Sequence, residues 1–66
     1  MRGQKTLLQA AVVQRLRAAG YHSLADAAND AWSHGEPVNL DGLMVIDRDQ
    51  TELRADYEKA DRQARA

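Results

Sequence analysis

The spacing of apolar and polar residues predicts a first helix over residues 7–19. Thr6 and Gln9 are three residues apart in the arrangement of a capping box, in which side chains satisfy free N–H groups at a helix start. Gly20 follows as a residue suited to the left-handed conformation that closes a helix. The apolar positions between these ends recur at helical spacing and are Leu8, Val12, Leu16 and Ala19.

A second helix is predicted over residues 24–34, directly after a short connection. Ser23, with Asp26 three residues later, is typical of a helix start, and Gly35 and Pro37 are typical of a helix end. One face of this stretch is apolar and consists of Leu24, Ala28, Ala31 and Trp32. The two helices and their short connection predict a helix-turn-helix pair.

Residues 38–46 change character and predict a short β-hairpin or an extended segment. The stretch contains β-branched residues and is divided by Asp41 and Gly42, a strong signal for a hairpin turn. The four consecutive apolar residues that follow, 43–46, favour burial on both faces. Such a ribbon has to pack against the helices or another chain, because two isolated strands are barely stable in water.

The last predicted helix covers residues 50–64 and begins after Asp49, an acidic N-cap candidate. Its apolar residues step by four and three positions and form a heptad-like seam of Leu53, Tyr57 and Ala60. The expected fold is therefore mainly α, a small single domain ordered helix, helix, short β ribbon, helix. Its predicted core consists of Leu8, Val12, Leu16, Leu24, Trp32, Leu43, Val45 and Leu53.

The chain has 66 residues and no cysteine, which limits how it can be stabilised. A domain of this size buries a small core, and disulfides and thiolate metal sites are excluded. We therefore expect a homodimer, formed through the helix over residues 7–19 or through the Leu53–Tyr57–Ala60 seam. No secretory signal or membrane-spanning stretch is recognisable, so a cytoplasmic location without membrane association is expected.

Charge is unevenly distributed, although the formal net charge is only −1. Residues 1–20 hold four cations and no acid, and these cations are candidate phosphate contacts: Arg2, Lys5, Arg15 and Arg17. Residues 21–47 hold five acids and no Lys or Arg. The acidic second helix would repel nucleic acid in the usual reading position, so DNA binding would have to use the basic first helix of a dimer.

No set of residues predicts catalysis, a metal site or a cofactor. A row of imidazoles and carboxylates at every fourth position consists of His22, Asp26, Asp30 and His34. The two histidines would lie roughly 18 Å apart along a helix. Each neighbouring His–Asp pair supplies two ligands where a structural zinc site needs four. Ser23 beside His22 has no accompanying oxyanion-hole loop, and helix capping accounts for it, so the chain is interpreted as non-enzymatic.

The acidic middle of the chain predicts binding to a protein with a basic surface. The predicted contact patch consists of Asp26, Asp30, Trp32 and Glu36. Trp32 is a typical interface anchor, and the alternative for this residue is a place in the core between the helices.

In size, lack of cysteine and acidic patch, the chain resembles the small inhibitors and antitoxins of phages and plasmids. The resemblance is one of composition, and it implies a regulatory protein that occupies a surface of its target without specifying site residues. Two alternatives stay open. One is a dimeric DNA-binding transcriptional regulator that uses the basic first helix, and the other is a structural subunit of a larger assembly.

Overall fold

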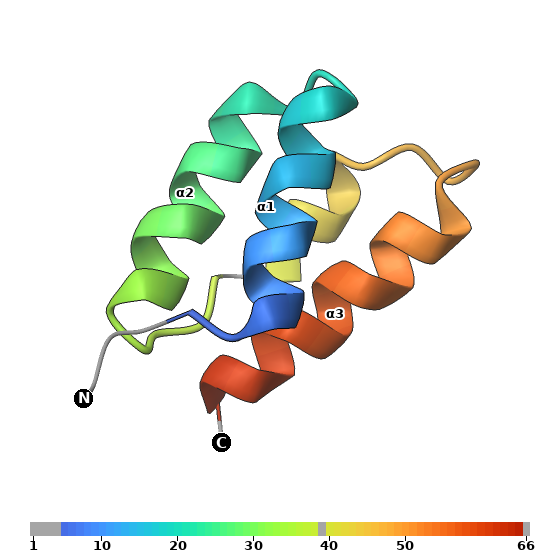
Figure 1. Cartoon of the computed structure of the whole chain (residues 1–66). Helices are drawn as coiled ribbons and strands as arrows, with labels where there is room; N and C mark the ends of the chain where they lie inside the picture. Colours follow the sequence, from blue (N-terminus) through green and yellow to red (C-terminus); the bar gives the residue numbers. More distant parts are fainter. Residues whose placement is uncertain (1–4, 39, 66) are drawn as a thin grey trace.

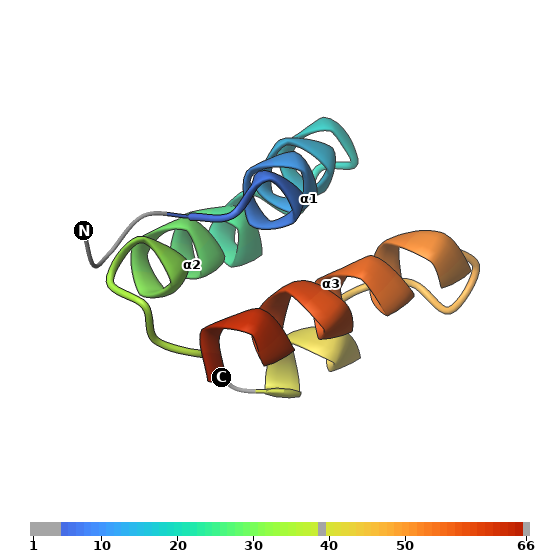
Figure 2. The same ribbon diagram turned by 60° about the horizontal axis from the view of Figure 1, so that its bottom comes forward.

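The computed structural model describes residues 5–38 and 40–65, which form a mainly helical domain (Figure 1). The order of elements is α1 (Leu7–Ala18), α2 (His22–Ser33), the 3₁₀-helix η1 (Leu40–Met44) and α3 (Thr51–Arg65). α1 and α2 run antiparallel, and α1 contacts both α2 and α3. In Figure 2, α1 and α2 form one layer and η1 lies beside α3 in the other. The mainly α class predicted from the sequence is confirmed.

α1 begins and ends at the signals found in the sequence. The Thr6 Oγ1 atom accepts from the Gln9 backbone N–H at 3.1 Å, and the Gln9 side chain accepts from the Thr6 N–H at 3.0 Å. At the other end Gly20 has a φ of +96°, and the Tyr21 N–H donates to the Leu16 carbonyl at 2.9 Å. Glycine is favoured there because a left-handed backbone strains other residues. This closed end turns the chain so that α2 packs against α1.

α2 begins two residues earlier than predicted, at His22. Tyr21 is its N-cap and makes no side-chain cap hydrogen bond, while the Tyr21 carbonyl accepts from the Ala25 N–H at 2.9 Å. Ser23 therefore lies inside the first turn, and the prediction that it caps the helix is wrong. The reason is the tight turn that closes α1, which brings the chain into a helical course before Ser23 is reached.

The predicted hairpin is absent from the described residues, which contain no strand, and Leu40–Met44 forms η1 instead. Gly42 is buried. A Cβ atom at this position would lie 2.8 Å from Tyr57 Cζ and 2.9 Å from Leu24 Cδ1. The glycine therefore allows close packing of η1 against the helices, which is a different use of glycine from a hairpin turn.

α3 begins at Thr51, one residue after the predicted start. The carbonyl of Gln50 accepts from the Arg54 N–H at 2.9 Å, so Gln50 occupies the capping position predicted for Asp49. Glu52 lies in the first turn, where a negative charge interacts favourably with the helix dipole. In the two described stretches, neither α3 nor any other helix has the length and apolar character needed to cross a membrane.

The core lies between the three helices and η1, and most of its predicted members are buried. Its apolar residues are Val12, Val13, Leu16, Leu24, Ala25, Ala28, Trp32, Ile46, Leu53, Tyr57 and Ala60. Leu8 and Leu43 are partly buried against this cluster. The prediction that Val45 lies in the core is wrong, because Val45 is 55% exposed and Ile46 is buried in its place. A 3₁₀ turn does not alternate its side chains between two faces as a strand does, which explains the exchange.

Candidate functional site

Three residues of the predicted contact patch are exposed, and we call them the acidic face: Asp26, Asp30 and Glu36. The Asp26 side chain is 68% exposed and pairs with Arg17 of α1 at 2.9 Å. The Asp30 side chain is 81% exposed, with its Oδ1 atom 3.8 Å from His34 Nδ1. The acidic face is therefore open to solvent over most of its area, and Arg17 compensates part of its charge.

Trp32, the fourth residue of the predicted patch, belongs to the core. It is 1% exposed, and its ring centroid lies 5.7 Å from that of Tyr57. Its position follows from helical spacing, because Trp32 shares the buried side of α2 with Leu24 and Ala28. The patch as predicted therefore lacks its aromatic anchor, and the core interpretation of Trp32 is the correct one.

Asp61 of α3 is a charged side chain inside the core, with no exposed surface. Its Oδ1 atom accepts from Trp32 Nε1–H at 3.1 Å and from the Val38 N–H at 2.5 Å. These hydrogen bonds connect α3 to α2 and to the segment that precedes η1. Burial, together with the nearby Asp61 carboxylate, raises the pKa of the Tyr57 hydroxyl from 10.0 to about 12. The four-residue spacing between Tyr57 and Asp61 is the sequence signal that places both on one side of α3.

The predicted oligomer seam faces the core of its own chain. Leu53, Tyr57 and Ala60 are 3%, 0% and 0% exposed. The Gln9 side chain of α1 donates to the Ala60 carbonyl at 2.9 Å and covers this part of α3. The heptad-like spacing thus indicates burial, but α1 and α2 occupy the place that was assigned to a second copy.

The cations that were predicted to contact phosphate bind other side chains of the same chain wherever the structure describes them. The contacts are Arg15 Nη1 to Asp56 Oδ2 at 2.6 Å, Arg17 Nη1 to Asp26 Oδ1 at 2.9 Å and Lys5 Nζ to Ser33 Oγ at 3.2 Å. Arg2 lies outside the described residues. Because carboxylates compensate Arg15 and Arg17, the first helix offers little net positive charge to a phosphate backbone.

The row of imidazoles and carboxylates on α2 forms a short-range contact at its end. The Nδ1 atom of His34 lies 2.7 Å from the Asp30 carbonyl oxygen, one turn earlier. Over residues 5–38 and 40–65, no three His, Asp or Glu side chains lie close enough together to hold a metal ion. All four residues of the row are exposed, so the row lies on the surface of the molecule.

An exposed apolar pair at the end of η1 was not predicted from the sequence. Met44 is 86% exposed and Val45 is 55% exposed. The Arg54 Nη1 group donates to the carbonyls of Leu43 at 2.6 Å and Ile46 at 2.7 Å. Because these carbonyls lie on either side of the pair, the guanidinium fixes the backbone that carries it. Four consecutive apolar residues in a tight turn cannot all be buried, and that is the signal that indicates an exposed pair.

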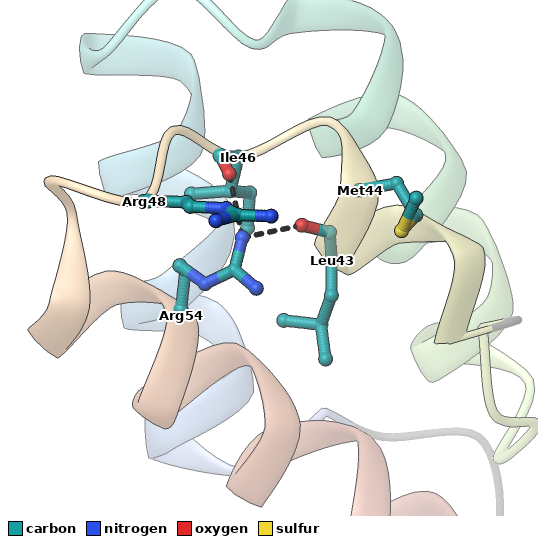
Figure 3. Close-up of a pocket in the computed structure, with 5 residues that line it drawn as sticks. All are labelled: Leu43, Met44, Ile46, Arg48 and Arg54. Carbon is teal, nitrogen blue, oxygen red and sulfur yellow. Dashed lines mark hydrogen bonds between the residues drawn. The ribbon is translucent and has the colours of Figure 1, made fainter.

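A small pocket, partly open to solvent, lies beside the exposed pair (Figure 3). We call it the arginine pocket, and it is lined by Leu43, Met44, Ile46, Arg48 and Arg54. Figure 3 shows the guanidinium groups of Arg48 and Arg54 at the same opening, while the Met44 side chain points away from them. Two cations next to apolar walls suit an anion that is attached to an apolar group.

No protein-family model, curated protein or solved structure matches this chain. The exposed pair, the arginine pocket and the acidic face are therefore the features from which a function can be proposed.

Proposed function

We propose that this chain is a small non-catalytic regulatory protein that binds a protein target and occupies part of that target's surface. The observation that carries the proposal is the exposed pair Met44 and Val45 beside the arginine pocket. Adjacent large apolar side chains on the surface are typical of protein interaction sites. The Arg54 hydrogen bonds favour a preformed contact surface, and a preformed surface loses less entropy on binding.

The acidic face supports the same function as a second contact, suited to a target with a basic surface. Exposed charges of this kind act mainly on the rate of association and on the choice of partner. The apolar part of the contact comes from Met44 and Val45, because Trp32 is held in the core. In this proposal the chain acts by binding its target and does not catalyse a reaction.

The test is affinity capture by the tagged protein from nuclease-treated lysate of its host, with mass spectrometry of the recovered proteins. Replacing the pair by Met44→Ser and Val45→Ser is expected to lower recovery of the target about tenfold or more, because the apolar contact is lost. Leu7→Ser is the matched control, since Leu7 is also a large apolar residue on the surface, 91% exposed. Circular dichroism of each variant checks that its helices are intact.

Reversal of the acidic face by Asp26→Lys and Asp30→Lys is expected to weaken capture of the same target. Undiminished capture by the Met44→Ser, Val45→Ser variant would contradict the exposed pair as the contact. Partners that are recovered from untreated lysate but not from nuclease-treated lysate would favour the DNA-binding regulator instead. Recovery of the chain alone, as a stable oligomer, would favour the structural subunit.

A further inference from the structure

The arginine pocket contains two cationic groups whose charge is not compensated within the described residues. Arg54 uses Nη1 for the carbonyls of Leu43 and Ile46, which leaves the N–H groups on Nε and Nη2 available. Arg48 makes no hydrogen bond or ion pair within the described part of the chain. Two like charges at one opening repel each other, so an anion placed between them is favoured.

The walls of the pocket specify what the anion should carry. Leu43 lines the pocket and is only half-buried, so it presents apolar surface beside the guanidinium groups. A guanidinium binds a carboxylate through two parallel hydrogen bonds, which fixes the orientation of the carboxylate. A carboxylate next to an apolar side chain therefore fits the pocket better than a free inorganic anion, which would leave the apolar walls uncovered.

The charges around the pocket favour a single negative charge over a polyanion. Asp47 and Asp49 flank Arg48 in the sequence and both are exposed, and the whole chain has a formal net charge of −1. A phosphate backbone would meet these carboxylates along with the arginines. A monoanion that reaches only into the pocket avoids most of that repulsion.

We infer that the arginine pocket binds the C-terminal carboxylate of a partner protein whose last residue is apolar. The last residue of a protein carries its carboxylate and its side chain on one carbon, so it reaches the guanidinium groups and the apolar wall together. An internal Glu or Asp instead carries its carboxylate on a backbone that continues in both directions. Capture of a C-terminal carboxylate is an established mode of peptide recognition. This inference rests on the proposed function, since it names the part of the target that the chain contacts.

The test is a titration of ¹⁵N-labelled protein with two short peptides, followed by NMR. Acetyl-Gly-Ser-Gly-Leu with a free carboxylate is expected to shift the Nε–Hε signals of Arg48 and Arg54, with a Kd on the order of 1 mM. The same peptide with an amidated C-terminus is expected to bind at least about tenfold more weakly, because the charge-assisted bonds are lost. Unchanged signals with the free-carboxylate peptide, or equal binding of the amidated one, would overturn the inference.

Two further comparisons identify the group that is bound. Arg48→Gln is expected to weaken binding of the free-carboxylate peptide about fivefold or more, whereas Arg62→Gln, at an exposed arginine outside the pocket, should leave it unchanged. Equal effects of the two substitutions would place the peptide elsewhere. An amidated peptide with an internal Glu that binds as well as the free carboxylate, or inorganic phosphate that displaces the peptide at equal concentration, would overturn the assignment to a C-terminus.

The outcome separates the inference from the proposed function. If lysate capture depends on Met44 and Val45 but the free-carboxylate peptide does not bind, the inference fails and the proposed function stands. If the peptide binds in the pocket but no target is captured, the pocket is an anion site and the proposed function fails.

Discussion

Gly42 determines at the residue scale how closely η1 approaches the helices. A Cβ atom there would overlap the Tyr57 hydroxyl oxygen and lie 2.9 Å from Leu24 Cδ1. We expect Gly42→Ala to lower the free energy of unfolding by about 1–3 kcal/mol, because an added methyl group displaces neighbours in a close-packed core. Urea denaturation followed by the fluorescence of Trp32, the only tryptophan, measures this change.

The control for the Gly42→Ala prediction is the same substitution made in a Tyr57→Phe variant, which lacks the hydroxyl. In Tyr57→Phe the oxygen that the new Cβ atom would overlap is absent, so Gly42→Ala should cost less there than in the native chain. Equal costs in the two backgrounds would show that the destabilisation does not come from contact with the Tyr57 hydroxyl.

Tyr57 also makes stability depend on pH at the alkaline end. Its pKa is about 12 in the folded chain against 10.0 ordinarily, so the folded state keeps its proton after the unfolded state has lost it. The corresponding stability is fully present below pH 10 and is lost as the pH rises from 10 to about 12, by about 2–3 kcal/mol. Urea denaturation between pH 8 and 11.5 measures the loss. Tyr57→Phe should remove this component of the slope, whereas Tyr21→Phe should leave it, and identical slopes in both variants would contradict its origin in Tyr57.

At the scale of elements, Asp61 connects three parts of the fold that few other contacts join. Replacing it by Asp61→Asn keeps one acceptor for Trp32 and Val38 but removes the charge, and we expect a loss of about 1–2 kcal/mol. Asp61→Ala leaves both donors without an acceptor in the core and should cost about 3–5 kcal/mol. Chemical denaturation of the two variants measures the difference.

Asp56→Ala is the matched control, because it removes a carboxylate of the same helix that lies nearer the surface. The Arg15–Asp56 pair has side-chain exposures of 44% and 32%, so its loss should cost less than about 1 kcal/mol. If Asp61→Ala costs no more than Asp56→Ala, the buried hydrogen bonds contribute nothing beyond an ordinary surface pair.

How far each element could be predicted from the sequence depends on whether its signals are local. The start of α1 was predictable because Thr6 and Gln9 bond each other within one turn. The course of residues 40–46 was not, because Gly42 is needed for contact with Tyr57, fifteen positions further along, rather than for a hairpin turn. The Asp–Gly pair is a turn signal both in a hairpin and in a 3₁₀ turn, and only the tertiary packing distinguishes the two structures.

The same distinction applies to the candidate site. The exposure of Asp26 and Asp30 followed from helical spacing, since they lie opposite the apolar side of α2. The arginine pocket could not be predicted, because it depends on Arg54 of α3 reaching carbonyls that lie eight and eleven residues earlier. Helical spacing also placed Trp32 on the apolar side, so the core interpretation of this residue was available from the sequence alone.

For the whole molecule, the structure shows how a chain of 66 residues without cysteine closes its core. α1, α2 and α3 each bury apolar residues in one cluster, and Ile46 adds the contribution of the segment after η1. Hydrogen bonds of Asp61 and Arg54 and the Arg15–Asp56 ion pair connect the same elements. The core occupies the seam on α3, which leaves the outer side of α1, with Leu7 91% exposed, as the surface for a predicted homodimer.

Thermal unfolding at different protein concentrations decides whether that homodimer contributes to stability. Because one core closes within the chain, we expect two-state unfolding with an enthalpy of about 45 kcal/mol near 60 °C and a Tm that is independent of concentration. Calorimetry between about 10 µM and 500 µM tests this, since dimerisation of the folded state would raise Tm with concentration. A rise that Leu7→Glu abolishes would place a stabilising dimer on α1. A constant Tm would mean that the fold is complete in one chain and that the exposed pair is free for a different protein.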